Sequence, residues 1–325
     1  MSDGLNPEDL GPGSDLDARG AVIDDELMAK LMAATEGKFG HADFSNARFT
    51  GRTAFPWARF RRALFTGAEF EAMEEFGPIE AEEFVLDRAT FARWLWIEPS
   101  AKRISCQGTT FNDGVSLRVG AGVVDATGTV FGSTSTIMSR VQLWPRDDDY
   151  AHDTFWPRGG VVSLRDTDVS NLVIVDMELD WCLFAGAHRL DQLRLEGRIK
   201  FNHPPFNGRW TLRQILAEEL FVRRLDLKHP YIDGHSHVEA GRVAALYRSL
   251  RKSFEDSKNE AGAGDFYYGE MEMRRRAVST RQAERRILAA YWLLSGYGQR
   301  AGRAIIALGV VVTVVCVAVP RRPAG

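Results

Sequence analysis

Large apolar residues recur along the first third of the chain with a period that fits neither a helix nor a flat strand. From His41 onward, a phenylalanine returns at every fifth residue, with two slips to six. Most of these rings follow a small residue by two positions. The rings are Phe44, Phe49, Phe55, Phe60, Phe65, Phe70 and Phe76, and the small residues are Ala42, Ala47, Thr53, Ala58, Ala63 and Ala68.

A five-residue period keeps one side chain buried only if the chain turns a corner in every repeat. On an α-helix, five residues rotate a side chain roughly 140° from its starting direction. On a strand, an odd step moves it to the other face. The pattern therefore predicts a solenoid, whose stacked coils bury the column of rings. The alternative is an antiparallel β-sandwich, which requires period-two alternation with turns roughly every 8–12 residues, and the run lacks both.

A second run follows the same period farther along the chain. Leu164, Val169, Ile174, Leu179 and Phe184 are spaced five apart. The stretch 93–160 between the runs is the least regular, with echoes of the pattern at 109–111 and 129–131. Within it, residues 142–160 have the composition of a protruding loop. We expect one β-helix over residues 41–196.

The repeats themselves resemble a known family. A-D-F-S-N, A-R-F-T-G, A-R-F-R-R and A-L-F-T-G are similar to the pentapeptide-repeat pattern A-(D/N)-(L/F)-x-x, most clearly over residues 41–92. This resemblance implies a mainly β fold, a right-handed quadrilateral β-helix with four repeats per coil. The later run LYRSLRK…GDFYYGEMEMRR is similar to the segment that follows the repeats in some actinobacterial members, just before their membrane region.

The flanking segments have different compositions. Residues 1–40 read as an acidic leader, disordered over its Gly-, Pro- and Asp-rich first half and helical at 22–35, where a short helix would cap the β-helix. Residues 197–282 read as a linker followed by helices, with a helical pattern at 211–225 and a hairpin that breaks at Asn259–Gly264. Residues 283–303 are expected to form a juxtamembrane interfacial helix.

Residues 304–319 are uncharged and rich in valine. As a helix they would extend roughly 24 Å, which is shorter than the ~30 Å hydrocarbon core of a bilayer. Arginines crowd before the stretch, Tyr291, Trp292 and Tyr297 fall at the level of an interfacial belt, and Pro320 ends it. We predict one transmembrane helix, with the bulk of the chain cytoplasmic at the cell membrane. The alternative is a helix docked on the protein's own surface or in a homodimer.

The net charge of −3 is unevenly distributed. Residues 1–40 carry about −6, residues 41–196 about −7 and residues 197–325 about +10. The basic end suits an anionic membrane surface. Some pentapeptide-repeat proteins mimic DNA with an acidic rod that occupies a topoisomerase, and the acidic balance of 41–196 permits this alternative. Arginines interrupt a continuous negative stripe there, namely Arg48, Arg52, Arg59, Arg61, Arg62 and Arg93.

Catalytic signals are sparse. The three cysteines have no disulfide or metal-ligand spacing, and no nucleotide-binding or nucleophile motif is present. We therefore predict a protein that is not an enzyme, needs no cofactor and does not bind nucleic acid directly. The expected function is a non-catalytic scaffold or interaction module for a protein partner, held at the cytoplasmic face of the membrane.

One histidine-rich loop is the exception. The segment HPYIDGHSHVEA carries His229, Asp233, His235, His237 and Glu239. An H-x-H pair with nearby acids can ligate zinc or another transition metal, so Asp233, His235 and His237 are weak candidates for a metal site. The proline and glycine of the segment instead indicate a solvent-facing loop. A metal-dependent enzyme that uses residues 229–239 is the second alternative function.

Overall fold

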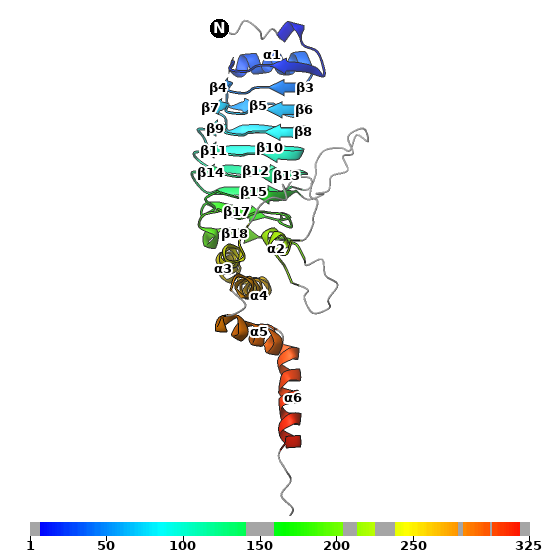
Figure 1. Ribbon diagram of the computed structural model, residues 1–325. Coiled ribbons are helices and arrows are strands. Elements are labelled where there is room, and N and C mark those ends of the chain that lie inside the picture. Colours follow the sequence, from blue (N-terminus) through cyan, green and yellow to red (C-terminus); the bar gives the residue numbers. More distant parts are fainter. Residues whose placement is uncertain are drawn as a thin grey trace, which may run out of the picture.

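The computed structural model of the protein describes residues 7–140, 159–203, 213–224, 238–278, 282–299 and 301–318. Over these residues the chain forms a parallel β-solenoid of about eight turns, followed by helices that lie beyond its C-terminal end (Figure 1). The prediction of a β-solenoid followed by helices is confirmed.

Two columns of parallel strands build the solenoid. The longer sheet follows the order β1, β3, β6, β8, β10, β12, β15, β17, β18, and β5, β13 and β16 pair beside this path. Its strands are β1 Ser14–Asp17, β3 Lys38–Asp43, β5 Thr53–Ala54, β6 Ala58–Leu64, β8 Glu75–Val85, β10 Leu95–Ser105, β12 Val115–Val119, β13 Val123–Asp125, β15 Ser135–Ser139, β16 Gly160–Ser163, β17 Leu172–Val175 and β18 Arg194–Glu196. The second sheet contains β2 Val22–Ile23, β4 Arg48–Phe49, β7 Glu69–Phe70, β9 Thr90–Phe91, β11 Thr110–Phe111 and β14 Val130–Phe131.

The second sheet sets the length of a turn. Its register pairs Phe49 with Phe70, Phe70 with Phe91, Phe91 with Phe111 and Phe111 with Phe131. The turns from Phe91 to Phe111 and from Phe111 to Phe131 therefore have the length of four five-residue repeats. The two turns before Phe91 are one residue longer. The rings lie nearly parallel, with centroids 4.6, 4.3, 5.1 and 6.0 Å apart. A column of stacked rings thus fills the interior of the solenoid.

Small residues make room for these rings. Ala47, Ala63 and Ala68 are fully buried beside the phenylalanine columns. Phe44 and Phe65 stack on each other at 5.0 Å and touch the neighbouring column through Phe49. The interior can pack at the density of a protein core because large and small side chains alternate along each turn.

One corner of the solenoid adopts a left-handed backbone in successive turns. Asn46, Gly67, Arg88, Gly108 and Gly128 have φ of 57°, 69°, 57°, 65° and 64°. Glycine and asparagine adopt this conformation most readily. The same corner geometry therefore repeats once in every turn, and it redirects the chain from one sheet to the next.

The irregular middle of the sequence continues the solenoid up to Arg140. Strands β10, β12 and β15 pair in register, with Leu95 opposite Val115 and Leu117 opposite Ile137. Branched aliphatic residues replace phenylalanine here, which is why the aromatic period fades while the fold persists. Residues 141–158, most of the loop predicted at 142–160, lie outside the described residues, and Gly160 already begins β16.

The solenoid begins earlier than the sequence indicated. The prediction of disorder up to residue 20 is wrong for β1, because β1 pairs in parallel with β3. A strand at this edge joins the core through a single buried side chain, Leu16. The helix predicted at 22–35 is α1, Asp25–Thr35, and Asp24 caps it by accepting a hydrogen bond from the Leu27 amide at 2.8 Å. Helix α1 lies over the N-terminal end of the solenoid (Figure 1), and its Met28 and Leu31 are buried in the core.

The solenoid also extends past the boundary predicted at 196. Lys200 forms a bridge with Glu178, and Phe201 is fully buried in the core. Beyond it, the described part of the predicted helix at 211–225 contains only the short α2. The helices are α2 Ala217–Val222, α3 Ala240–Asp256, α4 Glu260–Ala277, α5 Ala283–Ser295 and α6 Ala301–Ala318, with short 3-10 turns at Pro7–Asp9 and Leu190–Gln192.

The predicted helical hairpin is present as α3 and α4, although its break lies earlier than expected. The Asn259 side chain accepts a hydrogen bond from the Gly262 amide at 3.0 Å, so α4 already begins at Glu260. The glycines that suggested a loop lie inside α4. At Gly269, a Cβ would lie 2.5 Å from the Tyr247 ring, so glycine is what lets the two helices approach.

Replacing a stacked ring should be costly. We expect Phe70→Ala to lower the free energy of unfolding by about 3–5 kcal/mol, because it removes a fully buried ring between Phe49 and Phe91 and leaves a cavity. Chemical denaturation followed by circular dichroism measures this loss. Val130→Ala in the same sheet is the control, since Val130 is 50% exposed, and it should change the stability by less than about 0.5 kcal/mol. Equal losses for both variants would contradict the packing described here.

Candidate functional site

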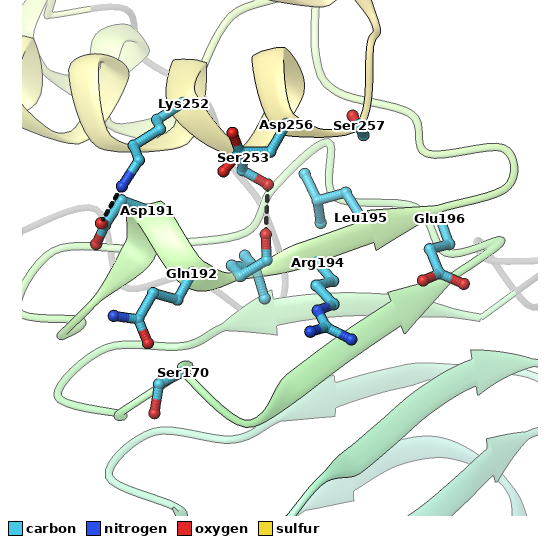
Figure 2. Close-up of a pocket in the computed structure, with 11 residues that line it drawn as sticks. Ser170, Asp191, Gln192, Arg194, Leu195, Glu196, Lys252, Ser253, Asp256 and Ser257 are labelled. Atoms are coloured by element: carbon cyan, nitrogen blue, oxygen red, sulfur yellow. Dashed lines mark hydrogen bonds and ion pairs between the residues drawn. The ribbon is translucent and has the colours of Figure 1, made fainter.

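A groove separates the last turns of the solenoid from helix α3, and it is the first candidate for a functional site (Figure 2). Its volume is about 580 Å³. Solenoid residues form one wall and α3 the other. The polar residues that face it include Ser170, Asp191, Gln192, Lys252, Ser253 and Asp256.

Two contacts hold α3 across this groove. Lys252 Nζ lies 2.9 Å from Asp191 Oδ2, and the hydrogen bond from Lys252 lowers the pKa of Asp191. The Ser253 hydroxyl donates to the main-chain carbonyl of Leu193 (Figure 2). The Ser253 hydroxyl is therefore already hydrogen-bonded to the main chain, and no histidine lines the groove. This arrangement fastens a helix to the end of the solenoid and offers no activated nucleophile.

A buried ionic cluster lies between α2 and α3. Glu219 is fully buried and accepts hydrogen bonds from Arg213 at 2.6 Å, from the Tyr247 hydroxyl at 2.6 Å and from Arg223 at 2.7 Å. Burial alone would raise the pKa of Glu219, but the charges of Arg213 and Arg223 outweigh it and lower the pKa. We refer to Arg213, Glu218, Glu219, Arg223 and Tyr247 as the junction cluster.

The neighbouring Glu218 connects α2 to the solenoid. Its carboxylate accepts hydrogen bonds from the main-chain amides of Phe184 and of Ala185, the latter at 3.0 Å. Burial raises the pKa of Glu218 to about 7. The junction cluster thus joins the last solenoid turn to α2 and α3 through groups that are costly to leave unpaired.

Helix α5 continues this fastening towards the C-terminus. The Trp292 indole donates to the Tyr268 hydroxyl at 2.8 Å, and Arg275 lies over the Trp292 ring at 5.3 Å. Tyr297 is 1% exposed and donates to Glu272 at 3.3 Å. Of the three aromatic residues expected at a membrane interface, Tyr297 is therefore part of the helical core, while Tyr291 is 40% exposed.

Helix α6 differs from every other helix described. Its apolar side chains are exposed on all sides, among them Ile305, Ile306, Leu308, Val310, Val311, Val312, Val314 and Val315. Within the described part of the chain, no helix combines the length and the apolar character needed to cross a membrane. The predicted transmembrane helix at 304–319 is therefore not supported as a span.

The predicted metal ligands fall outside the described residues. Asp233, His235, His237 and also His229 lie in the segment 225–237, and only Glu239 is described, as the residue before α3. Across the described ranges, no group of three histidine, cysteine, aspartate or glutamate side chains could hold a metal ion. Cys106 and Cys182 are buried, and burial raises the pKa of both thiols, which makes them poor nucleophiles.

Sequence inspection missed the junction cluster. Its one signal was the pair Glu218–Glu219 inside the apolar stretch ILAEELFV, since two adjacent acids on a buried helix require partners. Those partners, Arg213 and Tyr247, lie 6 and 28 residues away from Glu219, so spacing alone could not identify them.

Comparison of the chain with protein-family models, with curated proteins and with solved structures finds no match. No relative therefore supplies a residue role or a ligand.

Glu218 predicts a pH dependence of stability. Its folded pKa of about 7 lies above its ordinary value of 4.5, so the folded state holds a proton that the unfolded state has lost. The contribution of Glu218 is favourable below about pH 4.5 and is lost as the pH rises through about 7. Glu218→Gln should therefore match the wild type near pH 5 and exceed it at pH 8, by no more than about 3 kcal/mol.

Thermal unfolding at several pH values between 5 and 8 measures this difference. Glu69→Gln is the matched control, because it removes an exposed carboxylate from the solenoid. A stability difference between Glu218→Gln and wild type that does not change with pH would contradict the prediction.

Proposed function

We propose that this protein is a non-catalytic interaction module, a rigid solenoid attached to a membrane by helix α6. The observation that carries the proposal is the exposure of apolar side chains on all sides of α6, with Val311 56% and Ile305 69% exposed. A helix that is apolar all round is typical of a protein interior or a membrane. Among the described residues, no protein interior surrounds α6.

The surroundings of α6 support attachment to an anionic surface. Helix α5 exposes Ile287, Leu293 and Leu294. Arginines precede and accompany these residues, and they include Arg274, Arg275, Arg276, Arg285, Arg286 and Arg303. The basic excess on the N-terminal side of α6 favours a cytoplasmic solenoid.

The length of α6 bears on how it enters the bilayer. Its 18 residues extend roughly 27 Å, a few ångströms less than the ~30 Å apolar core. A short apolar helix can be accommodated by local thinning of the bilayer. The single-pass topology predicted for residues 304–319 stays a prediction, and the proposal requires only that α6 enters the apolar layer.

We also propose that the solenoid is a divergent pentapeptide-repeat β-helix, right-handed and quadrilateral in section. The turn length close to four five-residue repeats, the inward phenylalanines and the small residues before them support this assignment. The family resemblance raised the alternative of DNA mimicry. The surface weighs against it, because Arg62 pairs with Glu83 at 2.7 Å and Arg59 with Glu80 at 3.3 Å across adjacent turns, which breaks a continuous acidic face.

Membrane attachment can be tested with the full chain and with a chain that ends at Gly302. We expect the full chain to float with vesicles that contain anionic lipid and to resist a carbonate wash, and the shortened chain to stay in the soluble fraction. The double substitution Val311→Arg with Val315→Arg should reduce flotation at least tenfold, because each charge is costly in the apolar layer.

The matched control places the same charges elsewhere. Val22→Arg with Val130→Arg introduces two arginines at exposed positions of the solenoid and should leave flotation unchanged. The contrary result is that both chains are soluble and that the full chain is a dimer. In that case α6 is a dimerisation helix, and the proposed membrane attachment is wrong.

A further inference from the structure

A second hollow lies on the side of the solenoid and shares no residue with the groove beside α3. Its volume is about 300 Å³, at the lower end of the range for small-ligand sites. Strands β5, β8 and β10 form it together with the loop between β5 and β6. Its walls include Pro56, Trp57, Glu75, Pro78, Trp96 and Glu98, and Arg140 completes them. We call this hollow the tryptophan pocket.

The register of the solenoid explains why these side chains meet. Glu75 pairs with Trp96 on the neighbouring turn, so both residues point outwards on the same face. The register between β8 and β10 then shifts by one residue, because Gly77 and Pro78 of β8 together oppose Glu98 of β10. Bulges of this kind often redirect side chains next to functional sites.

Two residues that line the pocket each have a buried polar atom without a hydrogen-bond partner among the described residues. Glu98 is only 8% exposed, and its Oε1 pairs with Arg140. Its Oε2 and the indole Nε1 of Trp96 are buried without a hydrogen bond among the described residues. Leaving such a group unsatisfied typically costs about 1–3 kcal/mol. The protein covers both atoms, so an occupant with one donor and one acceptor would remove this cost only once the two side chains turn towards the hollow.

The charges of the pocket favour a cationic occupant. Glu75 and Glu98 contribute two carboxylates, whereas Arg140 is the one cation among the residues that line it. Trp57 is 59% exposed and offers apolar ring surface beside them. The same part of the fold already shows how a guanidinium fits an indole, because Arg118 lies over the Trp96 ring at 5.1 Å.

We propose that the tryptophan pocket binds an arginine side chain of an extended peptide from a partner protein. The guanidinium is planar, carries several donors and stacks on aromatic rings, so it suits Glu75, Glu98 and Trp57 together. A main-chain carbonyl of the peptide accepts the hydrogen bond of Trp96 Nε1 once the indole turns towards the hollow. Pro56 and Pro78 extend the apolar wall. This inference rests on the proposed interaction role of the solenoid and is independent of membrane attachment.

The test uses three labelled pentapeptides and the full chain in detergent micelles. Gly-Pro-Arg-Pro-Gly is the probe, its prolines holding the peptide extended. The second peptide has citrulline in place of arginine, which keeps the shape and removes the charge, and the third has leucine. Fluorescence anisotropy should show the arginine peptide binding at least tenfold more tightly than either of the others.

Substitutions then locate the binding. Trp57→Ala and Glu75→Gln should each weaken binding of the arginine peptide at least tenfold. Trp94→Ala is the matched control for the first, since Trp94 is 49% exposed, and Glu82→Gln is the control for the second. Both controls should leave the affinity unchanged, and thermal unfolding checks that all four variants fold.

Two results would overturn the proposal. One is equal affinity for the arginine and citrulline peptides, or no binding at millimolar concentration. The other is binding that survives both Trp57→Ala and Glu75→Gln. Vesicle flotation of the same preparation separates this failure from that of membrane attachment. A chain that floats without binding the peptide ends the pocket proposal alone, and a chain that binds the peptide without floating ends the attachment alone.

Discussion

The stacked phenylalanine rings of the second sheet hold the turns of the solenoid from β4 to β14 in register. Phe49, Phe70, Phe91, Phe111 and Phe131 occupy the same position in successive turns, and a shift of one residue would move a ring out of the core. Because the strands of this sheet are only two residues long, main-chain hydrogen bonds alone could not specify that register. In these turns, which carry most of the tryptophan pocket, ring packing and the longer strands of the first sheet together set which residues face outwards.

The parts of the fold that could be predicted are those in which one residue type marks each turn. Phenylalanines made the first run visible, and regular aliphatic spacing made the second visible. The middle was not predicted because Ile97, Leu117 and Ile137 continue the column of Phe76 with branched aliphatic side chains that are not distinctive in the sequence. Strand β1 was not predicted for a related reason. A parallel edge strand of four residues needs only one apolar side chain, here Leu16, to join the core.

The candidate sites were harder to predict than the fold. The apolar character of α6 was visible as an uncharged run, because it is a property of local composition, whereas its exposure became known only from the structure. The junction cluster and the tryptophan pocket depend instead on residues from different turns, such as Glu75 and Trp96, which meet only once the register is known. Cross-turn neighbours are separated in the sequence by one whole turn, and the bulge at Gly77 and Pro78 alters that separation where the pocket forms.

The two ends of the solenoid are both covered, by α1 at one end and by Phe201 with the α3–α4 hairpin at the other (Figure 1). An uncovered terminal turn would present unpaired main-chain groups and a row of apolar side chains to any second copy of the chain. Parallel in-register stacking of that kind is the geometry by which fibrils grow. The terminal helices therefore complete the core and also set the length of the solenoid. Without them, further turns could in principle be added without limit.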